Sequence, residues 1–136
     1  MMKTREYLNQ SYKLEKRINS KLDQISTLRA MAENISSTIS DVPPSGTRNV
    51  SRTQDIIIKI IGLENEINDD IDSLIEVKHE IMHAIKGVDN IDCQLLLEMR
   101  YLSYHTWEQI AVDLGYCMDN VFKLHRRALD MISFPE

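Results

Sequence analysis

The segment Thr106–Val121 reads TWEQIAVDLGYCMDNV, and this pattern favours two short helices joined by a tight turn. Thr106 followed three residues later by Gln109 is the pattern of a capping box, which begins a helix. Gly115 ends that helix and provides the turn, and small Ala111 allows the two helices to cross closely. The segment therefore predicts a helix-turn-helix, with Val121 as the apolar residue that holds the second helix against the first.

The flanking residues extend this prediction into a small helical domain over 88–136. Gly87 ends the preceding helix, and Asp89 with Asn90 can cap a compact helix over 91–102. The first helix of the motif is expected over 107–114, and the final helix over about 118–132.

A long helix is predicted upstream, from about Thr53 to Lys86. Apolar residues recur there every seven positions and fill a companion seam, in which Asp70 is the one polar member: Ile60, Ile67, Leu74 and Ile81, with Leu63, Val77 and Ala84. Such heptads indicate a coiled coil or a long helical hairpin. Because a buried carboxylate is costly, Asp70 is expected near solvent or a basic partner.

The first helix is predicted from about Thr4 to Ser40. One apolar stripe runs along it at steps of three and four: Leu14, Ile18, Leu22, Ile25 and Leu28, continued by Ala32, Ile35 and Ile39. A loop rich in Pro, Gly and Ser near 40–54 separates the two long helices. We therefore expect an all-α fold, with a coiled-coil-like helical hairpin over 1–87 followed by the helix-turn-helix domain.

Composition places the chain among ordinary globular proteins. Hydrophobic residues make up 43% and charged residues 27%, which argues against a disordered or fibrous chain. No apolar run is long enough for a transmembrane helix, and two cysteines make no disulfide framework, so a cytoplasmic location and no membrane partner are expected. Residues 1–30 carry seven basic and three acidic side chains, and 55–92 carry three and ten, so the two arms can attract each other.

The stretch from Leu95 to Leu129 resembles region four of bacterial sigma factors. The runs that carry the resemblance are Met99-Arg100-Tyr101-Leu102, then Thr106 to Gly115, then Leu124-His125-Arg126-Arg127-Ala128-Leu129. With its long helical arms and the Pro-Pro-Ser-Gly-Thr-Arg loop, the whole chain is similar to small phage and prophage transcriptional regulators of the ArpU/RinA kind. The resemblance implies a regulator of late genes in a bacterial host cell. Cys117 stands where sigma-like proteins usually place a serine as helix cap, and cysteine caps poorly.

The last helix supplies the candidate DNA-binding residues: Met118, Asp119, Asn120, Lys123, Arg126 and Arg127. A helix-turn-helix presents the first turns of this helix to the major groove. There Asn120 can pair with an adenine edge, Asp119 can accept from cytosine, and Met118 can pack on a thymine methyl. The basic residues suit phosphates. Tyr101, Trp107 and Tyr116 are expected in the core of the small domain.

One motif points to a different chemistry. His79-Glu80-Ile81-Met82-His83 matches the HExxH pattern of zinc proteases. Ile81 belongs to the buried seam, however, so both histidines are expected on the outside of the helix, where they could at most bind zinc adventitiously. A catalytic zinc needs a third protein ligand and a cleft. No other enzyme signature is present, and we expect neither enzymatic activity nor a cofactor.

The sequence thus predicts a DNA-binding transcriptional regulator that recognises a promoter-proximal site on double-stranded DNA. Its helical arms would dimerise or contact bacterial RNA polymerase, with a homodimer favoured. The alternative is a protein-interaction module that binds polymerase or another regulator without sequence-specific DNA contact, for which the acidic second helix would suit a basic protein surface.

Overall fold

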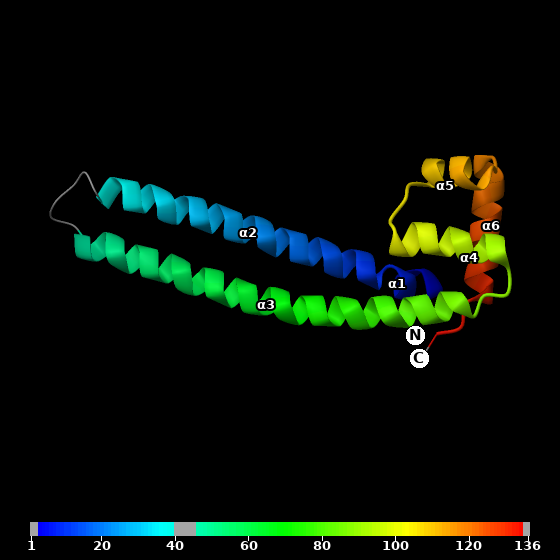
Figure 1. The fold of residues 1–136 in the computed structure, drawn as a ribbon, viewed down its shortest axis with the longest axis horizontal. Coiled ribbons are helices and arrows are strands. Elements are labelled where there is room, and N and C mark those ends of the chain that lie inside the picture. The colour runs from blue at the N-terminus through cyan, green and yellow to red at the C-terminus, as the bar shows by residue number, and fades with distance from the viewer. Residues whose placement is uncertain (1–2, 40–45, 135–136) are drawn as a thin grey trace. The chain divides into compact units, whose positions relative to one another are not determined.

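All regular secondary structure is helical in the computed structural model, which describes residues 3–39 and 46–134, with side chains for 3–35 and 50–134 (Figure 1). The elements are α1 (Thr4–Leu8), α2 (Gln10–Ile39), α3 (Gly46–Lys86), α4 (Ile91–Leu97), the π-helical turn η1 (Glu98–Leu102), α5 (Trp107–Leu114) and α6 (Met118–Met131). The predicted all-α class is confirmed. None of these helices combines the length and the apolar character that crossing a bilayer requires.

Contacts group the chain into two compact units. The residues up to Glu15, together with those from Ser73 onward, form one unit, and Lys16–Asp72 form the other. We call them the tail unit and the arm unit. The predicted boundary between the helical hairpin and the helix-turn-helix domain, near residue 87, stays a prediction. It rests on sequence pattern, whereas the two units are defined by contacts.

The second long helix begins earlier than predicted. Of the expected loop over 40–54, residues 40–45 lie outside the described residues, whereas 46–54 form the first turns of α3. The expectation of a loop over 46–54 is therefore wrong. Both prolines of the segment, Pro43 and Pro44, precede Gly46, and a single glycine at the end of a helix does not prevent helix formation.

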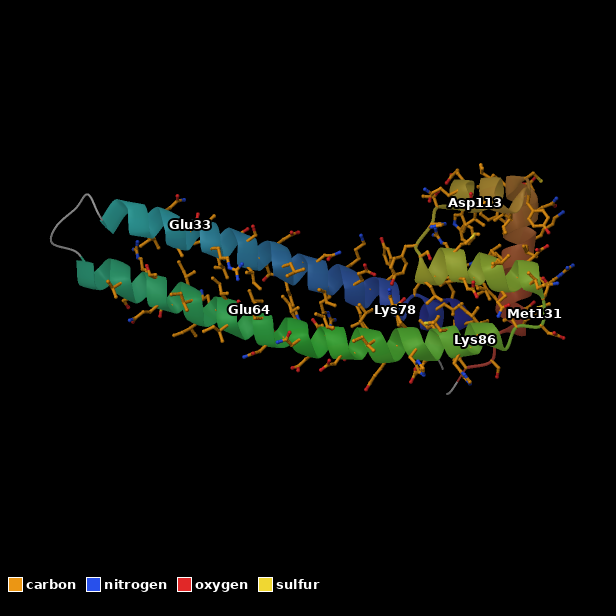
Figure 2. All side chains as sticks on the ribbon, in the orientation of Figure 1. Glu33, Glu64, Lys78, Lys86, Asp113 and Met131 are labelled. Atoms are coloured by element: carbon orange, nitrogen blue, oxygen red, sulfur yellow. The ribbon has the colours of Figure 1, made fainter. Side chains whose placement is uncertain are left out.

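In the arm unit, α2 and α3 run antiparallel and side by side (Figures 1 and 2). Their shared seam is apolar, with Ile18 and Ile25 of α2 and Ile56, Ile60 and Ile67 of α3 all buried. Leu22, expected in this seam, is instead 49% exposed. The heptad spacing that brings Ile18 and Ile25 to α3 places Lys21 between them, one residue before Leu22.

Lys21 meets the one polar member of the α3 seam. Its Nζ donates to Oδ2 of Asp70 at 2.6 Å, and the two side chains are only 17% and 15% exposed. The expectation that Asp70 lies near a basic partner is confirmed. Because each charge in the seam needs the other, the pair favours one alignment of the two helices over slipped alternatives.

In the tail unit, α3, α4, η1, α5 and α6 contribute to one apolar core. Ile81, Leu96, Leu97, Ile110 and Val121 are all fully buried in it. Leu8 of α1 is fully buried in the same core. The Tyr7 ring stacks on Phe134 with centroids 4.5 Å apart, so both ends of the described chain pack into this unit.

Neutralising one charge in the seam should destabilise the arms. We expect Lys21→Ala to lower the free energy of unfolding by about 3 kcal/mol, because the substitution leaves the largely buried Asp70 carboxylate without its partner. Urea unfolding followed by circular dichroism at 222 nm measures the loss. The double variant Lys21→Leu/Asp70→Leu should recover it, since apolar seam residues replace both charges.

The matched control for this prediction is Arg29→Ala. Arg29 pairs with Glu64 at 3.4 Å, but these side chains are 63% and 50% exposed. An exposed pair contributes at most about 1 kcal/mol. Equal losses for Lys21→Ala and Arg29→Ala would show that the seam pair has no special role.

Candidate nucleic-acid interface

The helix α5 begins at the predicted capping box. The backbone N–H of Gln109 donates to Oγ1 of Thr106 at 3.2 Å, and the backbone N–H of Thr106 donates to Oε1 of Gln109 at 2.9 Å. These two bonds satisfy polar groups that a helix start leaves unpaired. Ile110 and Ala111 are buried, and they fix the face that α5 turns toward the core.

The turn after α5 depends on Gly115, whose φ of 76° lies in the left-handed region. Its N–H donates to the carbonyl of Ala111 at 2.9 Å, and the N–H of Tyr116 donates to the same carbonyl at 3.0 Å. A side chain at this position would be strained. The Tyr116 hydroxyl donates to Asp92 of α4, and this hydrogen bond raises the pKa of Tyr116. The turn is thereby tied to α4.

The helix α6 begins at Met118 with a weak cap. Cys117 has the extended backbone of an N-cap residue, φ −75° and ψ 160°, but its side chain makes no capping hydrogen bond. The predicted poor capping by cysteine is confirmed. Asp119 lies in the first turn, where a negative charge interacts favourably with the helix dipole.

The inner face of α6 carries a histidine that sequence reasoning missed. Val121, His125 and Ala128 are buried, whereas Leu124 is half-buried. The Nε2 of His125 and the Tyr101 hydroxyl share a hydrogen bond of 2.6 Å. Burial, together with the charges of Arg5 and Arg100, lowers the pKa of His125 to about 4. The ring is therefore neutral near pH 7. The sequence signal for the burial of His125 was its spacing, four residues after Val121 and three before Ala128.

The outer face of α6 carries the predicted polar residues. Asp119, Asn120, Lys123, Arg126 and Arg127 are all exposed, whereas Met118 is half-buried and packs against the core. At about 100° per residue, Asp119, Lys123 and Arg126 share a row that points directly away from the core. Asn120 and Arg127, seven residues apart, share a flank. Burial raises the pKa of the Cys93 thiol in α4, and the positive charge of Arg127 partly opposes this rise.

The aromatic residues of the small domain belong to the packing. Tyr101 is buried, and Trp107 and Tyr116 are half-buried against the core. The Trp107 ring lies 4.7 Å from the His125 ring and 5.6 Å from the Phe122 ring, centroid to centroid. The Arg100 guanidinium lies 4.3 Å from the Trp107 centroid. These contacts agree with the predicted core role of Trp107.

A groove beside the start of α5 brings together residues that lie far apart in the chain. It has a volume of about 510 Å³ and is lined by Asn9, Tyr12, Lys13, Arg100, Tyr104 and Thr106. The Tyr12 and Tyr104 rings meet edge to face at 5.4 Å, and Tyr104 has an unusual positive φ of 59°. Sequence reasoning had no signal for this groove, because more than ninety residues separate Lys13 from Tyr104 and Thr106.

The two histidines of the HExxH motif lie on the surface of α3. Both His79 and His83 are exposed, as predicted from the burial of Ile81. Within the described ranges, no three or more His, Cys, Asp or Glu side chains gather in a way that could hold a metal ion.

The buried neutral histidine gives stability a defined pH dependence. Because the pKa of His125 is lower in the folded protein than its value of 6.5 in the unfolded chain, protonation favours unfolding. We expect the free energy of unfolding to fall as pH drops from 6.5 towards about 4. In His125→Gln, which cannot titrate, urea unfolding at a series of pH values should give a shallower fall. Parallel curves for the two proteins would contradict this assignment.

The two caps of the motif should respond to substitution in opposite directions. Cys117→Ser supplies the missing cap acceptor and should stabilise the protein by about 0.5–1 kcal/mol. Thr106→Ala removes the capping box and should destabilise it by about 1 kcal/mol. Thermal unfolding of both variants measures the shifts. A loss of stability in Cys117→Ser would show that the packing of the Cys117 thiol contributes more than the capping hydrogen bond of a serine.

Comparison with known proteins places the chain in an uncharacterised group. No curated protein and no solved structure matches it. The family model described as "Protein of unknown function (DUF1492)" matches residues 34–133, which include the end of α2, all of α3 and the elements from α4 to α6. The chain therefore belongs to the DUF1492 family of proteins of unknown function.

Proposed function

We propose that this protein is a DNA-binding transcriptional regulator of the phage or prophage type, acting in the cytoplasm of a bacterial host. In this proposal α5, the turn at Gly115 and α6 act as a helix-turn-helix, and α6 enters the major groove at a promoter-proximal site. The arms formed by α2 and α3 act as a helical hairpin that dimerises or contacts RNA polymerase. The resemblance to sigma region four and to regulators of the ArpU/RinA kind supports the proposal.

One observation carries the proposal. The capped helix α5, the left-handed turn at Gly115 and the helix α6 pack on one core, and α6 exposes a row of polar side chains. Val121 and Ala128 hold α6 inward, so Lys123 and Arg126 are free of the core. An α-helix fits the major groove when its outer face carries groups that pair with base edges and phosphates. Asn120 is the candidate for base contact, and Lys123, Arg126 and Arg127 are candidates for phosphate contact.

The groove beside α5 adds a second cationic surface to the same unit. Lys13 and Arg100 line it next to Thr106, at the positive end of the α5 dipole. Arg100 is already engaged, because it donates to the His105 carbonyl at 3.0 Å and covers Trp107. Lys13, which is exposed, is the better candidate for a phosphate of the DNA backbone flanking the major-groove contact.

Selection of bound duplexes from a random DNA pool, followed by affinity measurements over a salt series, tests the proposal. A recurrent motif is expected from the full chain. Asn120→Ala should lose about 1–3 kcal/mol of discrimination at one base position. Lys123→Ala should weaken binding to every sequence and reduce the slope of log affinity against log salt by about one.

Lys59→Ala is the matched control, because Lys59 is an exposed lysine of the arm unit. It should leave the selected motif and the salt slope unchanged. Binding that selects no motif and disappears at physiological salt would overturn the promoter-reading mechanism.

The alternative function is a protein-interaction module that binds polymerase or another regulator without sequence-specific DNA contact. The observation that favours it is the surface of α5, where Val112 is 81% exposed beside Glu108 and Asp113. This apolar and acidic patch would suit a basic partner protein, and so, by itself, would the acidic surface of α3. In that case Asn120→Ala and Lys123→Ala would leave partner binding intact, and substitutions of acidic residues over 64–80 would weaken it.

A further inference from the structure

The helix α3 carries a second row of apolar side chains besides the seam that faces α2. Large apolar residues are exposed along it, and they follow a heptad spacing: Val50, Ile57, Ile61, Ile71, Ile75 and Met82. The remaining positions of the same row are polar: Gln54, Glu64, Asn68 and Lys78. Ile61 and Ile57 are 53% and 47% exposed, so burying the row against another surface would remove much apolar area from water.

This second row points in its own direction. Ile61 follows the buried Ile60 by one residue, which is about 100° around the helix. A helix with two apolar rows at such an angle is suited to contact two neighbouring helices at once, as helices of bundles do. The first row of α3 contacts α2. The apolar residues of the second row are exposed, whereas its Lys78 already contacts Glu15 and the Tyr104 ring of the same chain.

The order of residues along the row indicates which helix that is. The row is symmetric about Glu66 in residue kind, so reading α3 backwards gives the same pattern. Val50 mirrors Met82, Ile57 mirrors Ile75 and Ile61 mirrors Ile71. The polar members mirror one another as well, since Gln54 pairs with Lys78 and Glu64 with Asn68. Two identical helices that pack antiparallel across a two-fold axis need this symmetry, because each residue then meets its mirror residue in the other copy.

The charges of α3 agree with this arrangement. The row itself holds one acidic residue, Glu64, which pairs with Arg29 of the same chain and would face the uncharged Asn68 of a second copy. Glu66 lies on the opposite side of the helix, about 180° from the row, and Asp69 about 120°. Packing through the row therefore keeps the acidic sides of two copies apart. A strongly basic partner would instead be drawn to the acidic side.

We propose that two copies of this chain associate through the second row of α3, antiparallel, with the two-fold axis crossing the row at the axial level of Glu66. The contact is isologous, and Ile61 of each copy packs on Ile71 of the other. This inference specifies the dimerisation part of the proposed function. Only the role of the dimer in a DNA-binding regulator rests on that proposal. Its tests contain no DNA, so a failure to bind DNA and a failure to dimerise are distinguishable.

Sedimentation equilibrium of the full chain tests the association. We expect a dimer, and we expect Ile57→Glu/Ile61→Glu to raise the dimer dissociation constant by at least about 100-fold, because each substitution would bury an unpaired charge. The matched control is Leu22→Glu/Met31→Glu, which alters apolar residues of α2 with 49% and 48% exposure that lie outside the row. This control should remain a dimer. A monomeric native chain, or equal weakening by both double variants, would overturn the proposal.

Distances between spin labels test the antiparallel alignment without relying on a destabilising variant. Single cysteines at Ser51 and Asp72, which share a flank of the row, are introduced with Cys93→Ala and Cys117→Ser, and circular dichroism checks the fold. At 1.5 Å per residue, the axial separation across an axis at Glu66 is about 45 Å for Ser51 pairs and about 18 Å for Asp72 pairs. Short distances at both positions would indicate a parallel pair, and no measurable dipolar coupling at Asp72 would indicate no pair. Either result would refute the proposal.

Discussion

The candidate interface depends on the packing of α6 against α4 and α5. Leu97, Ile110 and Val121, one from each helix, are fully buried in the same core, and Ile81 of α3 joins them there. This packing sets the rotation of α6 about its own axis. Once Val121 and Ala128 face inward, helical geometry leaves no other place for Asp119, Lys123 and Arg126 than the outer side. The exposure of the candidate DNA-binding residues is thus a consequence of apolar burial elsewhere.

The buried pair of Tyr101 and His125 adds a polar element to this core. A hydrogen bond of 2.6 Å joins them, and the surrounding burial keeps the imidazole neutral near pH 7. A buried polar group without a hydrogen-bond partner is costly, and each of these two side chains provides the partner that the other needs. The pair ties α6 to η1 at a defined point, which complements the less directional packing of leucine and isoleucine. The tie matters because the cap at Cys117 contributes no hydrogen bond.

The arms follow a different principle, in which polar residues in the seam set the alignment of two long helices. Isoleucines repeated every seven residues can pack in several registers with similar burial. Lys21 and Asp70 remove this freedom, because only one alignment places their charges 2.6 Å apart. On the second row of α3 the same logic would apply between chains, with Glu64 and Asn68 at the centre of an otherwise apolar contact.

The sequence by itself determined the elements whose signals are local. Heptad spacing, the capping box of Thr106 and Gln109, the glycine at 115 and the weak cap at Cys117 were all predicted, because each acts over a few residues of chain. The helical start of α3 at Gly46 was missed, because a cluster of turn-forming residues does not reveal which of them lie inside a helix. The predicted roles in DNA binding stay predictions.

Tertiary structure decided what depends on residues far apart in the chain. Lys21 finds Asp70 across the arm unit, the hydroxyl of Ser11 donates to the carbonyl of Tyr101, and Lys13 lines a groove with Tyr104. It also decided that Leu22 is exposed and His125 buried, because one residue along a helix changes direction by about 100° and the neighbouring helices determine which direction is inside. Periodicity predicts that a helix has an apolar face, and only the packed partners show where that face begins and ends.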